Sequence, residues 1–339
     1  FGIAVGLASS IPQFNLKEVN QALINLLKNP DITDDEIICL PDFATGGIII
    51  NKDEVIESLK KGTGKAAIIQ AKIEYDKKEH CLIVTELPYG VYTNTICGEL
   101  EKLSQKDDNF GIVRINDLTG EQVCMKLYLA KAADPKRMID YLYQNTSLQS
   151  SYSINLTMLE DGRFPKVFKW KDALLSHLRH EEEVYTRCYE HEKEELHHKI
   201  KILNALRLAA RNIDVVVEHV QAAESFQEAS SSLRKALQID EEQAKAILDM
   251  KLSRLSKLEI SDIEQKLNKN MDRLAEVKDI LSNKDRLYAV MIERFQEVSK
   301  KFGDNRRTQV IQKEVITVPR AKKEKAAEPV VVCYTDNGY

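Results

Sequence analysis

Long apolar runs are absent from this sequence of 339 residues. No stretch approaches the roughly 20 apolar residues that a membrane-spanning helix needs, so we expect no membrane among its partners. No signal peptide is recognisable, but the chain begins with Phe1 instead of methionine, so its true N-terminus is expected to lie upstream. The chain also ends at Tyr339, inside a run of strand-forming residues, and we therefore expect it to be a fragment.

Paired cysteines are absent as well. The six cysteines are Cys39, Cys81, Cys97, Cys124, Cys188 and Cys333. None forms a C-x-x-C pair, which favours free thiols in a reducing compartment over a disulfide framework or a zinc site. Five of the seven histidines lie between His177 and His198 without an H-E-x-x-H spacing, so a solvated helix face is expected there and no metal site.

A complete active site is not recognisable. Gly62-Thr63-Gly64-Lys65 resembles a phosphate loop, but Leu59 and Ala66 occupy the positions where a Walker A motif needs glycine and Ser or Thr. No Ser/His/Asp or Cys/His arrangement and no D-x-D magnesium motif is present, so no catalytic residue, cofactor or metal ligand is assigned. Two interpretations of Lys65 remain: a solvated lysine after a turn, or a contact to a DNA phosphate.

The net charge of −4 is unusual for a freestanding DNA-binding module, which is typically strongly basic. The total charge is a poor test of DNA binding, however, when different parts of a chain have different functions.

Two structural halves are expected. In residues 1–165 short strands alternate with short helices, beginning with a helix that Asn15 caps and that ends at Asn29-Pro30, which is typical of an α+β layer. The strands expected there include Ala66–Tyr75 and Ile154–Leu159. Residues 166–302 have helical periodicity throughout. The C-terminal part of this half has apolar or aromatic residues at every seventh position: Ile260, Leu267, Leu274, Leu281, Tyr288, Phe295 and Phe302.

This heptad pattern predicts a coiled coil. Its expected partner is the equally long stretch Asp172–Asn212, running antiparallel. The helical segment Val215–Leu258 connects the two, and within it Asp240 and Gln243 are expected to cap a helix that includes Ala244. Without further information, this connecting segment is either a plain capped tip or a dimer contact. The surface around Leu248 is then either the tip's own core or a dimer surface.

The opening segment Phe1–Pro12 reads G-I-A-V-G-x-A-x-x-I-P after its first residue, and from residue types alone it is a hairpin packed in a core. It resembles the segment that follows the nucleophilic tyrosine in the A subunits of bacterial type IIA DNA topoisomerases, gyrase and topoisomerase IV. Further similarities follow in order along the chain: P-D-F-x-T-G-G at 41–47, G-x-G-K at 62–65, E-L-P-Y at 86–89, S-I-N at 153–155, Q-A-x-A-I-L-D at 243–249 and F-G-D-x-R-R-T at 302–308. Departures from the family pattern are Gln13, Thr63 and the pair Tyr92-Thr93.

The resemblance implies an α+β tower domain followed by a long antiparallel coiled coil with a small helical dimerisation domain at its tip. The tower beside the gate DNA would span 1–165, the ascending helix 166–214, the C-gate dimerisation domain 215–258, the descending helix 259–303, a linker 304–328, and the start of a C-terminal DNA-binding domain 329–339.

The resemblance also implies site residues. Ile3 would be an apolar wedge between base pairs, and a β-branched residue flanked by glycines suits that role because it is stiff and unsolvated. Lys65, Thr93 and Asn94 would contact DNA, with the lysine of the family's usual Asn-Lys pair replaced by Thr93 here. Leu248, Leu252 and Leu255 would form the dimer interface.

For the whole enzyme, the resemblance implies an ATP-dependent type II topoisomerase, an isomerase that cuts and reseals both DNA strands. The nucleophilic tyrosine would precede Phe1, so the fragment should be inactive alone and should bind no cofactor. Mg2+ and ATP would bind through a B subunit in an A2B2 heterotetramer, and the chain would belong to a cytoplasmic, nucleoid-associated homodimer. Gyrase and topoisomerase IV are not separated by these motifs, although the linker slightly favours topoisomerase IV.

Two other classes of protein compete with this interpretation. A structural coiled-coil spacer would need neither a glycine-flanked apolar tip nor the G-x-G-K turn, so these features favour the DNA-gate interpretation. An ATPase with a coiled-coil insertion is disfavoured by the failed Walker pattern.

Overall fold

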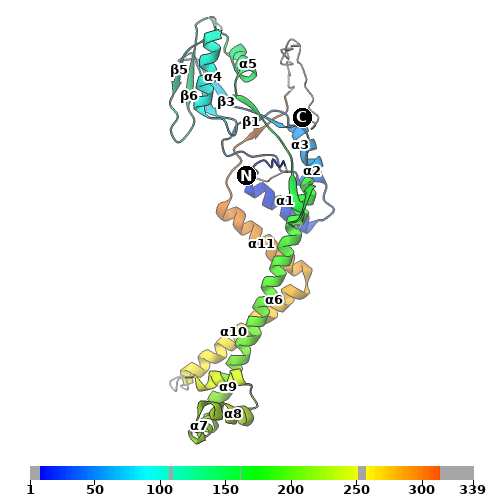
Figure 1. Cartoon of the computed structure of the whole chain (residues 1–339), viewed down its shortest axis with the longest axis vertical. Coiled ribbons are helices and arrows are strands. Elements are labelled where there is room, and N and C mark those ends of the chain that lie inside the picture. Colours follow the sequence, from blue (N-terminus) through cyan, green and yellow to red (C-terminus); the bar gives the residue numbers. More distant parts are fainter. Residues whose placement is uncertain (1–7, 107–109, 161, 251–256, 314–339) are drawn as a thin grey trace, which may run out of the picture.

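The computed structural model describes residues 8–106, 110–160, 162–250 and 257–313 and is elongated (Figure 1). Two α/β lobes occupy one end, long helices run away from them, and short helices form the far tip. The expected order, a mixed α/β portion followed by a helical portion, is therefore confirmed.

The first lobe is built on a four-stranded sheet with the order β10-β1-β2-β7. Its strands are β1 (Ile48–Ile49), β2 (Ala67–Gln70), β7 (Gln149–Tyr152) and β10 (Gln309–Val310). Its helices are α1 (Leu16–Lys28), α2 (Asp34–Ile37) and α3 (Lys52–Lys61). Because β10 pairs parallel to β1, the end of the described chain returns to the sheet near its beginning.

Helix α1 begins where the sequence predicts. The Asn15 side chain accepts a hydrogen bond from Lys17 N (3.0 Å), which satisfies one of the free amides of the first turn. The helix ends at Lys28, before Pro30, and its inner face buries Leu23 and Leu26 in the core of the first lobe.

The second lobe has a four-stranded sheet with the order β3-β4-β6-β5. Its elements are β3 (Lys72–Asp76), β4 (Cys81–Glu86), α4 (Thr93–Lys106), β5 (Ile112–Asp117), β6 (Met125–Leu129) and α5 (Pro135–Asn145). Leu82 and Leu127 of the sheet are fully buried in one cluster with Leu100 of α4 and Leu142 of α5.

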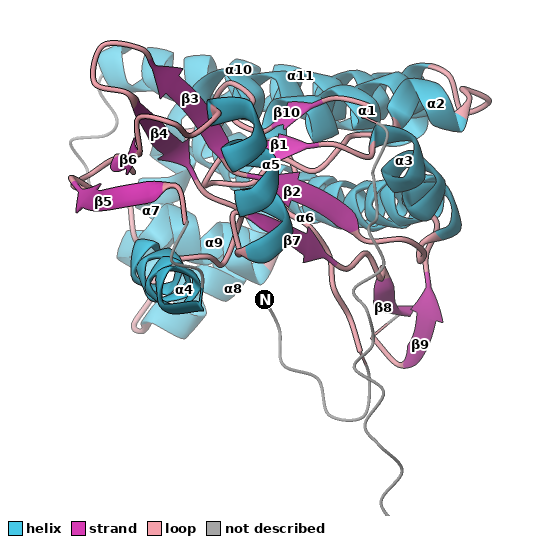
Figure 2. Ribbon diagram, turned by 90° about the horizontal axis from the view of Figure 1, so that it is seen from above, coloured by secondary structure: helices cyan, strands magenta, loops and turns pink. Residues whose placement is uncertain are grey.

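The predicted single strand over 66–75 is wrong, because the chain divides it between the two sheets at Ala71. The Ala71 amide donates to Leu148 O (2.7 Å) and its carbonyl accepts from the Tyr143 hydroxyl (2.7 Å), so neither group continues a strand ladder. The predicted strand over 154–159 is also wrong in its bounds, because residues 154–156 lie between β7 and β8. The strand β8 (Thr157–Glu160) forms a hairpin with β9 (Phe164–Val167). Figure 2 shows this hairpin projecting from the side of the first lobe.

The stalk consists of α6 (Trp170–Arg211) lying against α10 (Lys257–Ser282), with α11 (Lys284–Phe302) continuing toward the lobes (Figure 1). The ion pairs show that α6 and α10 are antiparallel: Arg211 contacts Glu264, whereas Glu192, earlier on α6, contacts Arg273, later on α10. Between them Leu196, Leu274 and Val277 form a buried apolar cluster.

The heptad pattern predicts one continuous helix over 259–303, but the structure interrupts it at Asn283. This residue has an extended backbone (φ −127°, ψ 110°), and its side chain caps α11 by accepting from Asp285 N at 3.0 Å. The two pieces have different partners. α10 packs on α6, whereas α11 also packs on α1, with Asn20 Nδ2 donating to Phe295 O and Ser299 Oγ.

The tip contains α7 (Ile213–Ala222), α8 (Phe226–Leu237) and α9 (Glu241–Leu248). The predicted cap of α9 is confirmed as a capping box, in which Asp240 and Gln243 bond each other's backbone amides. The tip core gathers around Ala209, Leu233 and Ile247.

In the part of the chain that is described, the cysteines and histidines are as predicted. Cys39, Cys81, Cys97, Cys124 and Cys188 are free thiols. The histidines from His177 to His198 are exposed on α6, as expected for a solvated helix face.

Candidate nucleic-acid interface

The Gly62–Lys65 turn ends α3 and leads into β2. Gly62 has a left-handed backbone (φ +80°), and a Cβ there would lie 2.1 Å from Phe168 O, so only glycine fits. Ser58 Oγ donates to Lys65 O (2.9 Å), which closes the turn back onto α3. Packing therefore explains this part of the G-x-G-K motif without a ligand.

The Lys65 side chain is largely exposed (76%), and its nearest acidic group is Glu54, with 3.9 Å between Nζ and Oε1. Asp53 and Glu57 line the same shallow pocket. Lys65 is thus free to reach a phosphate, although its surroundings on the α3 side are acidic.

The described end of the opening segment lies beside this turn. Ser10 and Asn155 exchange two backbone hydrogen bonds of 2.9 Å, and Asn155 Nδ2 donates to Ala8 O (2.9 Å). Asn155 also forms a bridge with Thr63. The structure thus brings the stretch that follows Ile3 next to the turn that precedes Lys65, while Ile3 itself lies outside the described residues.

Thr93 and Asn94 begin α4 in the second lobe, apart from the α3 turn (Figure 1). The hydrogen bonds of Thr119 and Thr93 to the Asp117 carboxylate lower its pKa, so the Thr93 hydroxyl already has a partner. Asn94 is exposed. No hydrogen bond or ion pair among the described residues joins this pair to Lys65.

One of the predicted dimer residues, Leu248, belongs to the tip. Leu248 is the last residue of α9 and is half-buried against the tip core, whereas Leu252 and Leu255 lie outside the described residues.

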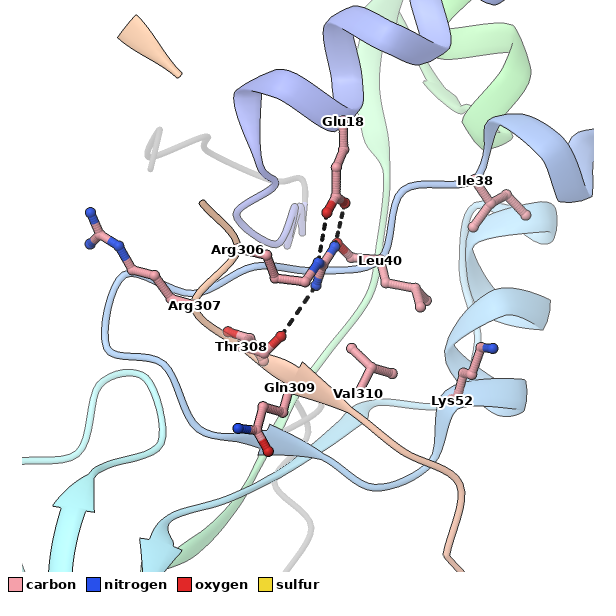
Figure 3. A pocket seen from close by; sticks show the side chains of 9 residues that line it. All are labelled: Glu18, Ile38, Leu40, Lys52, Arg306, Arg307, Thr308, Gln309 and Val310. Atoms are coloured by element: carbon pink, nitrogen blue, oxygen red, sulfur yellow. Dashed lines mark hydrogen bonds and ion pairs between the residues drawn. The ribbon is translucent and has the colours of Figure 1, made fainter. Parts of the chain in front are cut away.

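A set of contacts that the sequence did not reveal joins the end of α11 to the first lobe. We call the contacts that residues 304–310 make with α1 and with the 40–47 loop the clasp. In Figure 3 the Arg306 guanidinium points at the Glu18 carboxylate beside an open pocket. Arg306 Nε donates to Glu18 Oε1 (2.7 Å), Nη2 donates to Glu18 Oε2 and to Leu40 O (2.9 Å), and Nη1 donates to Pro41 O (3.0 Å). The bond to Glu18 raises the pKa of Arg306.

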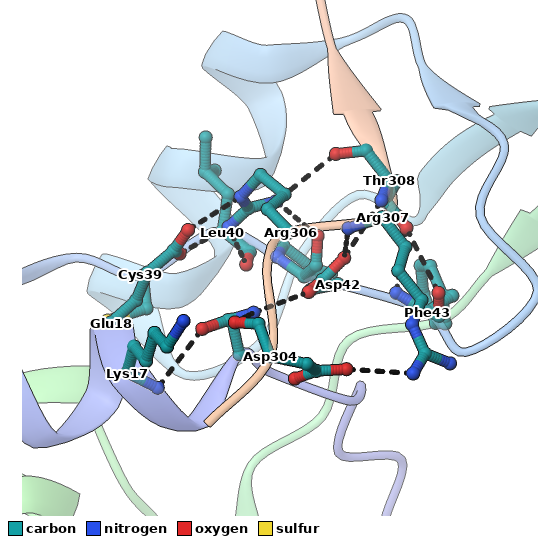
Figure 4. Close-up of polar contacts among 12 residues, drawn as sticks. Lys17, Glu18, Cys39, Leu40, Asp42, Phe43, Asp304, Arg306, Arg307 and Thr308 are labelled. Atoms are coloured by element: carbon teal, nitrogen blue, oxygen red, sulfur yellow. Dashed lines mark hydrogen bonds and ion pairs between the residues drawn. The ribbon is translucent and has the colours of Figure 1, made fainter. Parts of the chain in front are cut away.

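Asp42 is the second centre of the clasp (Figure 4). Its Oδ1 accepts from the amides of Arg307 (2.9 Å) and Thr308 (2.8 Å), and its Oδ2 accepts from Asn15 Nδ2 (3.0 Å). Burial acts to raise the pKa of Asp42, but these hydrogen bonds outweigh it and leave the pKa below its ordinary value. The buried Thr308 hydroxyl completes the clasp by accepting from Phe43 N (2.7 Å).

A possible metal-ligand group in the described part of the chain is Asp76, Glu79 and Cys81 at the β3–β4 turn. Glu79 already accepts from Lys126 Nζ (2.7 Å) and from the Tyr128 hydroxyl (3.2 Å). Cys81 is fully buried, and burial raises the pKa of its thiol. These contacts disfavour a bound cation.

Comparison with known proteins identifies the family. Residues 1–296 match the family of the DNA gyrase/topoisomerase IV A subunit. The chain is 32% identical over 314 residues to the DNA gyrase A subunit of Kosmotoga olearia, which covers 91% of this chain and 39% of that protein. It is 35% identical over 317 residues to that of Leptospira biflexa (91% and 37%) and 31% identical over 346 residues to that of Thermotoga maritima (100% and 42%).

The chain therefore belongs to the family of DNA gyrase and topoisomerase IV A subunits. It spans about two fifths of the length of these relatives. The relatives carry the gyrase name, whereas the linker had slightly favoured topoisomerase IV, and the family description includes both enzymes. None of the described helices has the length and apolar character required to cross a membrane.

Proposed function

We propose that this chain is part of the DNA-cleaving and rejoining subunit of an ATP-dependent type II topoisomerase, where it binds and bends the gate DNA and forms the C-terminal dimer gate. The observation that carries the proposal is the family match over residues 1–296. The arrangement agrees with it, because α/β lobes and a small helical tip stand at opposite ends of a helical stalk.

Residues 1–165 act as the tower beside the gate DNA. Ile3 is the wedge, Lys65 neutralises a phosphate, and Thr93 and Asn94 make further backbone contacts. The exposure of Lys65 and the position of Ala8–Ser10 beside the Gly62–Lys65 turn support a shared DNA contact for Ile3 and Lys65. Thr93 and Asn94, on the other lobe, contact a more distant part of the duplex.

Residues 166–214 and 259–303 form the coiled-coil arm, and residues 215–258 form the C-gate, with Leu248, Leu252 and Leu255 at the interface between two copies. The antiparallel pairing of α6 and α10 and the incomplete burial of Leu248 support this assignment. The linker expected over 304–328 starts later than the sequence predicted, because residues 304–310 belong to the first lobe through the clasp and β10; residues 329–339 begin a DNA-binding domain.

In the whole enzyme the tyrosine nucleophile lies outside this chain, and Mg2+ and ATP bind through the B subunit of an A2B2 assembly in the cytoplasm, at the nucleoid. The fragment alone is accordingly inactive and without a cofactor. Its own contributions are to bind, bend and gate the DNA.

Sedimentation of this chain with and without a short duplex tests the proposal. A dimer that resists salt supports the C-gate, provided that Leu248→Arg sediments as a monomer. Met271→Arg, a control at an exposed site, should remain a dimer. DNA binding that weakens as salt rises supports the tower. A strict monomer indifferent to DNA supports the structural spacer instead.

The wedge has a separate test in the full-length protein. Ile3→Ala should reduce DNA bending and cleavage while leaving thermal unfolding unchanged, because only an apolar insertion is removed. Unchanged bending would remove the wedge assignment.

A further inference from the structure

The break at Asn283 separates two helices that each have an end of their own. The Asn283 amide closes α10 by donating to Asp279 O (3.0 Å). Its carbonyl begins α11 by accepting from Arg286 N and Leu287 N, both at 3.1 Å. No backbone ladder is therefore continuous through this residue, and Figure 1 shows α10 and α11 running in different directions on either side of it.

The two sides of the break are fixed to different parts of the molecule. α11 packs mainly on α1, and the clasp holds the chain that follows it to the first lobe. α10 packs mainly on α6, and Ile263 near its start is buried in the tip core. α6 itself passes the break without interruption, with Trp170 Nε1 donating to Ile37 O (2.8 Å) at its root in the first lobe. Any movement of the tip relative to the lobes must therefore bend α6.

α6 has a feature that favours bending at the level of the break. Thr186 Oγ1 donates to the carbonyl oxygen of Glu182, four residues earlier, at 2.7 Å. A threonine that bonds this carbonyl competes with the backbone ladder and tends to bend a helix. The Glu182 side chain reaches the first turn of α11, so the bend point of α6 and the break at Asn283 lie opposite each other.

We call the contacts of the Glu182 carboxylate with α11 the latch. Glu182 Oε1 lies 2.9 Å from Lys284 Nζ, and Oε2 accepts from the Tyr288 hydroxyl at 3.3 Å. The hydrogen bond to Glu182 raises the pKa of Lys284, so the ammonium group stays charged at neutral pH. An ion pair between Arg286 Nε and Asp279 Oδ2 (3.4 Å) spans the break itself.

Apolar contacts flank the break as well. Ile280 of α10 and Leu287 of α11 are both buried in the core cluster of the first lobe. The burial of apolar surface is non-directional, so these side chains resist separation of the helices but resist a small change of angle less. Hydrogen-bonded ion pairs depend on both distance and direction, so the angle between the two helices is controlled by the latch.

We propose that the break at Asn283 is a hinge of the stalk, about which α10, residues 187–211 of α6 and the tip turn relative to the lobes, and that Glu182 latches this hinge. The inference concerns the stalk alone and does not depend on DNA binding. Lys284 is 74% exposed, and ion pairs at exposed positions are weak, so the latch opens and closes readily while both ends of the molecule stay folded.

The test measures the distance between two spin labels, one on the first lobe and one on the tip, by pulsed electron paramagnetic resonance on this chain. Non-natural side chains carry the labels at two exposed positions, Lys28 of α1 and Gln227 of α8, so the native cysteines are left unchanged. Labelled chain is mixed with an excess of unlabelled chain, so that a dimer contributes one labelled pair.

Glu182→Gln keeps the size of the latch residue and removes its charge. We expect the distance distribution to broaden about twofold and the amides at 284–287 to exchange hydrogen about threefold faster, as befits the loss of an exposed ion pair. Glu192→Gln is the matched control, because Glu192 pairs with Arg273 between α6 and α10 (2.7 Å) away from the break. The control should leave the distribution as in the wild type.

Two further measurements examine the latch from its other side. Lys284→Gln should broaden the distribution as much as Glu182→Gln, and the double variant should be no broader than either single variant. Raising the salt concentration to about 1 M, where the Debye length is about 3 Å, should broaden the wild-type distribution and leave that of Glu182→Gln unchanged.

Each outcome decides. A distribution that neither Glu182→Gln nor Lys284→Gln broadens overturns the inference. Equal broadening by Glu192→Gln also overturns it, because the stalk would then yield along its whole length and not at a hinge. All of these outcomes leave the DNA-gate proposal as it stands, since DNA binding and sedimentation test that proposal separately.

Discussion

In the stalk, α6 and α10 meet through apolar side chains repeated along both helices, with half-buried ion pairs such as Arg273–Glu192 at the edges. In the clasp, one arginine donates to oxygens of four residues, and the contact between Arg306 and Glu18 joins positions 288 apart in the chain. The packing of the stalk therefore depends on an apolar repeat that can be recognised in the sequence of the helices themselves. The clasp instead depends on contacts between segments that are far apart in the sequence.

The two arrangements should respond differently to substitution. An apolar seam loses stability in proportion to the volume removed and tolerates changes on its exposed face. A polar clasp loses stability when one partner leaves others buried and unsatisfied, whatever the volume. Three substitutions compare these responses, in order of decreasing effect.

The largest effect is expected for Leu274→Ala in the seam. Removing this buried side chain opens a cavity beside Leu196 and Val277 and should cost about 3 kcal/mol. Urea unfolding followed by far-UV circular dichroism measures the loss. Met271→Ala on the same helix is the control, since Met271 is 51% exposed and should change stability by less than about 0.5 kcal/mol. Equal losses for both variants would contradict a buried seam.

A smaller effect is expected for Arg306→Ala in the clasp. The change leaves Glu18 and two loop carbonyls without their donor, and we expect a loss of about 2 kcal/mol, lessened by the partial exposure of the pair. Urea unfolding again measures it. Arg307→Ala, whose guanidinium bonds the exposed Asp304, should cost under about 1 kcal/mol. If Arg306→Lys restored full stability, charge alone would suffice and the forked geometry would be irrelevant.

The smallest effect is expected for Asp42→Asn and depends on pH. Because the folded-state pKa of Asp42 is below the ordinary 3.8, its ionised form contributes stability that is complete above 3.8 and is lost as pH falls through the folded pKa. The variant should be about 1 kcal/mol less stable at neutral pH, and this difference should shrink in acid. Urea midpoints between pH 3 and 7, an interval chosen around the ordinary pKa, measure it. A difference independent of pH would show that Asp42 acts without its charge.

Local features of the fold were predictable from the sequence. The Asn15 cap of α1, the Asp240–Gln243 box of α9 and the long helices rest on residues within a few positions of one another. The break at Asn283 was not predicted, because the heptad spacing continues across it while the main packing partner of the helix changes from α6 to α1. The division at Ala71 was missed because no turn residue separates β2 from β3, and the groups that bond the Ala71 backbone, on Tyr143 and Leu148, are far away in the sequence.

The candidate interface was predictable in part. The motif at 62–65 identified an exposed lysine, and the structure shows that its first glycine is required by packing against Phe168. The S-I-N motif contained Asn155, but nothing in its spacing indicated a partner at Ala8, 147 positions earlier. The basic pair at 306–307 likewise gave no sign that one arginine is committed to Glu18 while the other is exposed.

The sequence by itself determined the family, the α/β and helical halves, the helix caps and the repeating seam of the stalk, because each is encoded by residue types at short and regular spacing. Only the tertiary structure decided which sheet each strand joins, where the descending helix breaks, and how residues 304–310 and 155 tie distant segments together. Those outcomes depend on which polar groups lose water on folding and must find partners, and the partners are supplied by whichever segments the packed core brings near.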